Sequence, residues 1–179
     1  MRPILATVVL SLVALPAAAA AQSSAGPVSG ALQSMMQRMQ RNLVGAAEDM
    51  PADKYGFKPT PAQMSFGQLV LHVAGSNDFM CQTISGEKAP ASEKLKPDDP
   101  KDKLVARLKA SFEFCNSALS KVTDDKLGDQ VPFFGGRTVS RAAAMMGLAE
   151  DWGDHYSAAA VYMRLNGVLP PSARRGQSE

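Results

Sequence analysis

Two residues near the C-terminal end of the chain combine an acid and an imidazole at helical spacing. Asp151 and His155 are four residues apart in EDWGDHYSAAAVYMRLNG, a stretch with the pattern of a buried helix. Residues at this spacing lie on one face of a helix, so the two side chains point the same way. Their neighbours on that face are mostly apolar, and a carboxylate there needs a compensating charge. A divalent metal ion supplies such a charge, and both side chains are ordinary metal ligands.

The chain has two histidines, and the second, His72, lies in the apolar stretch LVLHVAG. We place it on the apolar side of its own predicted helix. If that helix faces the helix of Asp151 and His155, the three side chains converge. Three protein ligands with an open position are typical of a reactive metal site, where bound water becomes more acidic. Zinc, nickel, manganese and iron all accept two histidines and a carboxylate, so the donor set does not select the metal.

Simpler interpretations of these residues stay open. A lone histidine on an apolar helix face is more often a hydrogen-bonded core residue than a ligand. Asp151 and His155 also suit an intrahelical ion pair, worth roughly 0.2–0.5 kcal/mol. The polar segment 76–78, one turn beyond His72, either hydrogen-bonds to a ligand or faces solvent. The sequence singles out no catalytic acid, base or nucleophile.

Four amphipathic segments form the elements that must position these residues. They cover roughly residues 28–48, 65–85, 100–122 and 138–166, with apolar residues at three- and four-residue spacing. Ser65 and Gln68 predict a capping box at the second segment, and Asp99 is the predicted N-cap of the third. We find no alternating strand pattern. The fold class is therefore all-α, a four-helix bundle whose helix order the two long connections leave open.

The ends of the chain are predicted to lie outside this bundle, which we assign to residues 28–171. Residues 1–21 have the charged start, apolar core and small-residue end of a secretory signal peptide. A retained N-terminal anchor is the alternative, although no stop-transfer pattern follows. Residues 22–27 are predicted to be a flexible segment and residues 172–179 a disordered tail.

Export places the protein in the periplasm or outside the cell, without stable membrane insertion after signal cleavage. Cys81 and Cys115 are the two cysteines, and such compartments favour a disulfide between them. Two separate buried thiols are the alternative. The formal net charge of +2 gives no electrostatic footprint for nucleic acid.

Two segments resemble the DinB/YfiT-like family of four-helix-bundle metalloproteins. They are MPADKYGFKPTPAQMSFGQLVLHVAGSNDFMC at 50–81 and DHYSAAAVYMRLNGVLPPS at 154–172. Members usually carry one metal-binding histidine on the second helix and a His-x-x-x-His pair on the fourth. The resemblance therefore implies that His72 and His155 are ligands, and that Asp151 replaces the histidine between them.

This resemblance implies a divalent-metal-dependent hydrolase or transferase with a His/Asp/His site and an unknown small-molecule substrate, and the predicted signal peptide makes it an exported one. Thiol transfer with cytoplasmic thiols suits an exported protein less well, so we expect hydrolysis. The alternative is a non-catalytic bundle with a degenerate metal site, which binds a small ligand or a protein. Pairing of family members through helix faces further implies a homodimer.

Overall fold

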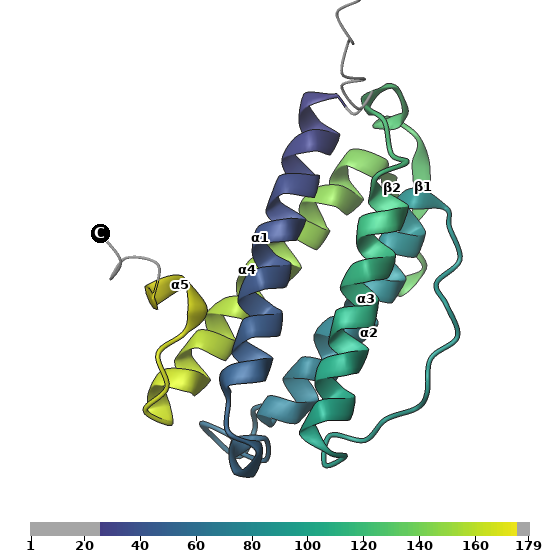
Figure 1. Cartoon of the computed structure of the whole chain (residues 1–179). Helices are drawn as coiled ribbons and strands as arrows, with labels where there is room; N and C mark the ends of the chain where they lie inside the picture. The colour runs from purple at the N-terminus through teal and green to yellow at the C-terminus, as the bar shows by residue number, and fades with distance from the viewer. Residues whose placement is uncertain (1–25, 175–179) are drawn as a thin grey trace, which may run out of the picture.

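The computed structural model describes residues 26–174 and forms four long helices from them (Figure 1). These helices are α1 (Pro27–Asp49), α2 (Phe66–Ser85), α3 (Lys101–Leu119) and α4 (Arg141–Leu165). The shorter elements are strands β1 (Gln130–Pro132) and β2 (Thr138–Ser140), helix α5 (Pro171–Arg174), and 3-10 turns at Ala52–Lys54, Asp124–Lys126 and Phe134–Gly136. The four predicted helices are therefore all present.

The helix order, which the sequence left open, follows from the two long connections. Helices α1 and α4 run in one direction, and α2 and α3 run in the other (Figure 1). The connection 86–100 returns along the length of the bundle, so α2 and α3 are parallel (Figure 1). Both α1 and α2 pack against α3 and α4, which makes α1 and α2 diagonal partners. The two predicted ligand helices, α2 and α4, are thus antiparallel neighbours.

The core lies between the four helices and contains a disulfide. Met36, Phe112 and Trp152 are fully buried, and the rings of Phe112 and Trp152 lie 6.1 Å apart at their centroids. Cys81 of α2 and Cys115 of α3 form the predicted disulfide inside this core, with Cα atoms 5.2 Å apart. This bond joins the parallel pair of helices near their C-terminal ends.

Local signals in the sequence set the ends of α2 and α4. Ser65 Oγ accepts a hydrogen bond from the Gln68 N–H at 3.2 Å, and Gln68 Oε1 accepts from the Ser65 N–H at 2.7 Å. This confirms the predicted capping box. Gly86 ends α2 in the left-handed region with φ of 81°, which glycine adopts without steric cost. Ser140 caps α4 by accepting from the Ala143 N–H at 3.2 Å.

The expectation of a chain without strands is wrong for the connection between α3 and α4. Strands β1 and β2 form an antiparallel hairpin in which Val131 pairs with Val139. Gly135 and Gly136, with φ of 68° and 72°, make the turn. Strands of three residues are too short to show an alternating pattern, and α4 begins at Arg141, after the hairpin.

Two further predictions about helix ends are corrected. Asp99 does not cap α3, because its carboxylate accepts from the Lys96 N–H at 2.7 Å within the preceding turn. The tail is not disordered from residue 172 onward, since Pro171–Arg174 form α5. The Tyr156 hydroxyl donates to Ser172 Oγ at 2.7 Å and holds this helix against the bundle.

The predicted signal peptide, residues 1–21, lies outside the described residues and stays a prediction. Of the predicted flexible segment 22–27, the structure describes Gly26 and Pro27, and Pro27 already belongs to α1. Within residues 26–174, no helix combines the length and the apolar character that a membrane span needs.

A distant carboxylate caps the N-terminus of α1. Asp124 accepts hydrogen bonds from the Ser29 hydroxyl at 2.6 Å and from the backbone N–H groups of Val28 and Ser29, both at 2.9 Å. The Ser29 hydroxyl, followed by the Val28 N–H, lowers the pKa of Asp124 below its usual value of 3.8. Each of these bonds favours the charged carboxylate.

We predict that Asp124→Asn lowers the melting temperature at neutral pH, because the amide has no charge and one acceptor oxygen fewer. The contribution of a carboxylate with a depressed pKa is present above its unfolded pKa and is lost as pH falls through its folded pKa. Thermal unfolding of the two proteins should therefore converge in acid, as the pH falls below 3.8 and through the lowered pKa of Asp124. Asp125→Asn at an exposed position is the control. A gap between wild type and Asp124→Asn that persists undiminished in acid contradicts the assignment.

Candidate metal centre

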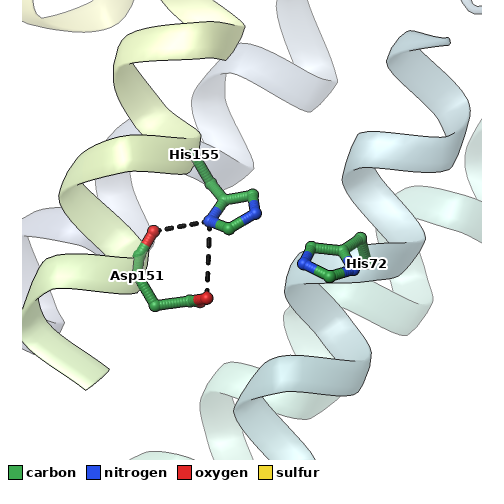
Figure 2. A group of neighbouring side chains, drawn as sticks. All are labelled: His72, Asp151 and His155. Atoms are coloured by element: carbon green, nitrogen blue, oxygen red, sulfur yellow. Dashed lines mark hydrogen bonds and ion pairs between the residues drawn. The ribbon is translucent and has the colours of Figure 1, made fainter. Parts of the chain in front are cut away.

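The structure brings the three predicted ligands together between α2 and α4. Asp151 and His155 lie on consecutive turns of α4, and His72 reaches toward them from α2 (Figure 2). The rings of His72 and His155 are 4.7 Å apart at their centroids, with 32° between their planes. One ligand atom from each of the three residues lies within 4.8 Å of the other two. We call these three residues the metal cluster.

The orientation of His155 is set by the backbone of α4. Its Nδ1 lies 2.6 Å from the main-chain oxygen of Asp151 and 3.5 Å from the carboxylate Oδ1 of the same residue (Figure 2). A carbonyl oxygen can only accept, so this contact places a proton on Nδ1. The other ring nitrogen, Nε2, then has its lone pair free. Metal-binding histidines are commonly oriented by this kind of carbonyl bond.

Asp151 has a carboxylate that the protein does not fully compensate. Its Oδ2 is buried and has no hydrogen-bond partner at normal distance, although the side chain as a whole is 22% exposed. Burial raises the pKa of Asp151, while electrostatic interaction with His155 and, to a smaller extent, with His72 opposes that rise. A buried oxygen without a partner costs about 1–3 kcal/mol. A cation between the two helices would remove that cost.

The three residues can surround a divalent ion after side-chain rotation. Ligand bonds of about 2.0–2.2 Å place two ligand atoms roughly 3.3–3.6 Å apart around a tetrahedral ion. The ligand atoms here lie within 4.8 Å of one another, so binding draws them together by up to about an ångström. Two imidazoles and one carboxylate suit zinc, iron, manganese and nickel. The structure supports the predicted convergence and leaves the choice of metal open.

His72 is exposed, which corrects the prediction that it lies on the apolar side of its helix. The buried side of α2 includes Leu69, Val73 and Asn77, and His72 lies beside that side at the edge facing α4. The sequence could not give this exposure, because it depends on which helices pack against α2. The consequence is that the metal cluster is open to solvent on the side of His72.

A buried polar network fixes α4 against α2 and α3. The Trp152 indole N–H donates to Asn77 Oδ1 at 2.7 Å, and Asn77 Nδ2 donates to Ser111 Oγ at 3.0 Å. All three side chains are almost completely inaccessible to solvent. Trp152 directly follows Asp151, so this hydrogen bond also sets the rotation of α4 that aims Asp151 at His72.

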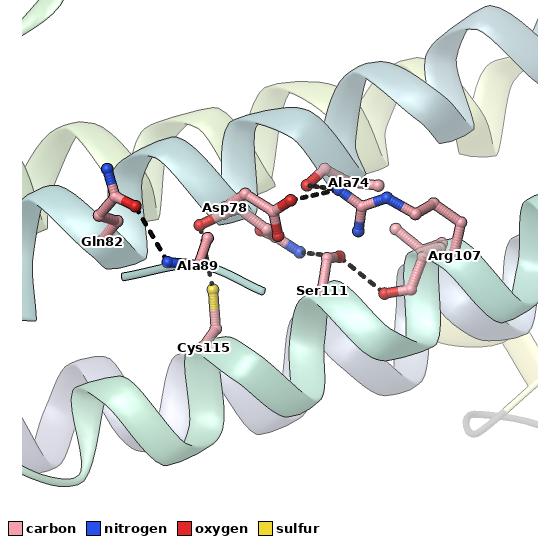
Figure 3. A network of polar contacts seen from close by, with 9 residues as sticks. Ala74, Asp78, Gln82, Ala89, Arg107, Ser111 and Cys115 are labelled. Atoms are coloured by element: carbon pink, nitrogen blue, oxygen red, sulfur yellow. Dashed lines mark hydrogen bonds and ion pairs between the residues drawn. The ribbon is translucent and has the colours of Figure 1, made fainter. Parts of the chain in front are cut away.

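The polar segment 76–78 thus has three different roles. The Ser76 hydroxyl faces Asp151 and favours its ionised form, although it is the weakest of the influences on that pKa. Asn77 joins the buried network. Asp78 forms an ion pair with Arg107 of α3, which also donates to the main-chain oxygen of Ala74 (Figure 3). A single Asn in the apolar part of a helix was the one sequence signal for this network.

We predict that Asn77→Ala lowers the free energy of unfolding by about 1–3 kcal/mol, because the buried indole N–H of Trp152 loses its acceptor. Denaturant unfolding measures the change. Asn116→Ala, at an exposed position of α3, is the matched control and should stay within about 0.5 kcal/mol of wild type. An equal, small effect for both variants would show that the network does not hold α4.

Comparison with known proteins identifies the family. A family model described as the DinB superfamily matches residues 35–157, a range that includes the whole metal cluster. The chain belongs to the DinB superfamily. This confirms the family that the sequence resembles, and the match contains the whole of the segment at 50–81 and ends at residue 157, within the segment at 154–172. No protein of curated function matches the chain.

Two solved structures share the DinB-like fold. A DinB-like protein from Bacillus subtilis aligns with a TM-score of 0.64 and 25% identity, over 78% of this chain and 95% of its own. A conserved protein from Enterococcus faecalis aligns with a TM-score of 0.62 and 17% identity, over 79% of this chain and 98% of its own. The second likeness shows the fold alone. Neither protein is described by a reaction, so any function must be argued from the site.

Proposed function

We propose that this DinB superfamily member binds one divalent metal ion through His72, Asp151 and His155, and that it acts as a hydrolase or transferase on a small molecule. The observation that carries the proposal is the buried Oδ2 of Asp151, which lacks a partner and belongs to a carboxylate facing two histidines. In an ordinary intrahelical ion pair, His155 alone would accompany Asp151. The approach of His72 from another helix supports a three-ligand site instead.

The residues around the site suit this role. When bound, a divalent ion supplies Lewis acidity and makes bound water more acidic. The carbonyl bond to Nδ1 of His155 orients the ring and keeps Nε2 available. The exposed position of His72 leaves one side of the site open to water and substrate. We assign no catalytic acid or base among the described residues.

We also propose that the protein works in the periplasm or outside the cell. The predicted signal peptide at 1–21 and the disulfide between Cys81 and Cys115 both support an oxidising compartment. Low-molecular-weight thiols of the cytoplasm are not the natural co-substrates there, so hydrolysis is the preferred reaction. Pairing as a homodimer through helix faces is part of the same proposal.

One observation favours a second function, that of a non-catalytic binding domain with a degenerate site. Asp151 stands where the family resemblance implies a histidine. A cavity of about 590 Å³ lies elsewhere, lined by residues such as Tyr55, Gln68 and Lys101, and does not include the metal cluster. In this alternative the metal site is weak, and the bundle binds a small ligand or a protein.

We predict that protein purified without chelators or a histidine tag contains about one equivalent of a divalent metal. Elemental mass spectrometry measures it. Asp151→Ala, and separately His72→Ala, should reduce the metal content to below about a tenth of an equivalent, because each removes one of three ligands. Asp154→Ala is the matched control, since it removes an exposed carboxylate on the same helix.

Full metal content in both ligand variants would refute the site. If the metal is lost as predicted, the loaded protein is assayed on a panel of esters, amides and phosphate esters, with chelated protein as the blank. Chelator-sensitive turnover of any of these supports a hydrolase. A stoichiometric metal with no turnover of any of them favours the binding-domain alternative.

We predict that Asp151→His changes which metal the site prefers. Imidazole nitrogen favours nickel and zinc, whereas carboxylate oxygen is relatively better for manganese. The ratio of nickel to manganese affinity, measured by competition titration, should rise on the order of tenfold. An unchanged ratio would mean that residue 151 does not contact the ion.

A further inference from the structure

The contact between α2 and α4 continues beyond the metal cluster in a regular antiparallel register. His72 lies opposite His155, with ring centroids 4.7 Å apart. One turn further along α2, the Ser76 hydroxyl faces Asp151, which lies one turn earlier on α4. Each such step moves about 6 Å along the helix axes. The next layer therefore lies directly beside Asp151, on the side away from His155.

That next layer contains aromatic rings. Gly147 of α4 has no side chain, so Phe133 of the hairpin connection can pack closely against the helix there. A Cβ atom at Gly147 would lie 3.2 Å from Cζ of Phe133 and 3.6 Å from Cε of Met80. The Phe133 ring thus rests against the backbone of α4, one turn before Asp151. The hairpin contacts both α2 and α4, at the end of the bundle where α2 ends and α4 begins (Figure 1).

Two more rings extend this layer to the surface. The Phe79 and Phe134 rings are 4.4 Å apart at their centroids, and the rings of Phe134 and Phe133 are 5.0 Å apart. Phe79 is 37% exposed and Phe134 is 46% exposed. Phe79 follows His72 by seven residues, which places it on nearly the same face of α2 and about 10 Å further along the axis. We call Phe79, Phe133 and Phe134 the aromatic cluster.

The size of the exposed surface favours a small molecule over a protein partner. A whole phenylalanine side chain offers roughly 200 Å², so the exposed parts of Phe79 and Phe134 amount to on the order of 150 Å². A stable protein interface takes about 800 Å² from each partner. One face of an aromatic ring of a ligand, in contrast, is covered by an area of this size.

We propose that the aromatic cluster is a substrate subsite of the metal centre. It binds a planar apolar group of the substrate. The reacting end of the same molecule lies at His72, Asp151 and His155, about 10 Å away along the helices. The substrate class is a small amphipathic ester or amide with an aryl or similar flat end on a flexible spacer. This inference rests on the proposed metal-dependent function and adds the substrate class to it.

The test uses two metal-binding probes that differ only in the aromatic arm. Acetohydroxamate has no arm, and phenylhexanohydroxamate carries a phenyl ring at about the required distance. Both are titrated calorimetrically into the zinc-loaded full chain. Burying a ring should make the phenyl compound bind about tenfold more tightly, or better, in the wild type.

Substitutions in the aromatic cluster should remove that preference. Phe134→Ala and Phe79→Ala should each reduce the advantage of the phenyl compound at least several-fold, roughly the loss of one ring contact. The affinity for acetohydroxamate and the zinc content should not change. Leu165→Ala removes a still more exposed apolar side chain, 59% accessible, from the far end of α4 and should keep the full preference.

The possible failures are distinguishable. Equal binding of both probes, or a preference unchanged in both Phe variants, overturns the subsite while leaving the metal site intact. Absence of zinc and of binding by either probe overturns the proposed function, and the subsite with it. The remaining case is that the aromatic cluster is a dimer interface. Analytical ultracentrifugation of the wild type and Phe134→Ala tests it by measuring the oligomeric state of each. If the substitution converts a dimer to a monomer, the cluster is an interface between copies and the subsite is refuted.

Discussion

The hydrogen bond from the Trp152 indole to Asn77 determines how α4 faces α2, and the candidate site depends on that orientation. Both groups are buried, so breaking the bond exposes neither of them to water. The bond is therefore strongly favoured over any other rotation of α4. Because Asp151 precedes Trp152, the same rotation directs its carboxylate toward His72. This contact thus links the packing of the core to the direction in which the Asp151 side chain points.

The location of the metal cluster explains both the free-energy cost of burying its carboxylate and its accessibility to solvent. A carboxylate at the centre of the bundle would need full compensation of its charge, whereas the half-buried Asp151 needs only partial compensation. His72 lies at the outer edge of α2, so its side chain can move toward a metal ion without leaving a void in the core. The disulfide and the Asp78–Arg107 ion pair hold α2 to α3 on the other side. Helix α2 is thus held in place by α3, while its contact with α4 at His72 stays open to solvent.

Sequence reasoning succeeded where a feature is local. The capping box at Ser65 and the shared face of Asp151 and His155 both follow from spacings of four residues or fewer. It failed where a feature depends on tertiary packing. The exposure of His72 and the contact of Trp152 with Asn77, 75 residues away, depend on helix order, which no local pattern encodes. The three-residue strands were missed because they are too short to repeat the two-residue alternation that identifies a strand.

The most direct test of the account is anomalous diffraction from crystals of the protein grown with zinc, recorded on both sides of the zinc absorption edge. The account predicts a single strong peak between α2 and α4. It should lie about 2.0–2.2 Å from a nitrogen of His72, a nitrogen of His155 and an oxygen of Asp151. An empty seam, with Asp151 and His155 forming only their intrahelical pair and His72 turned to solvent, would contradict it.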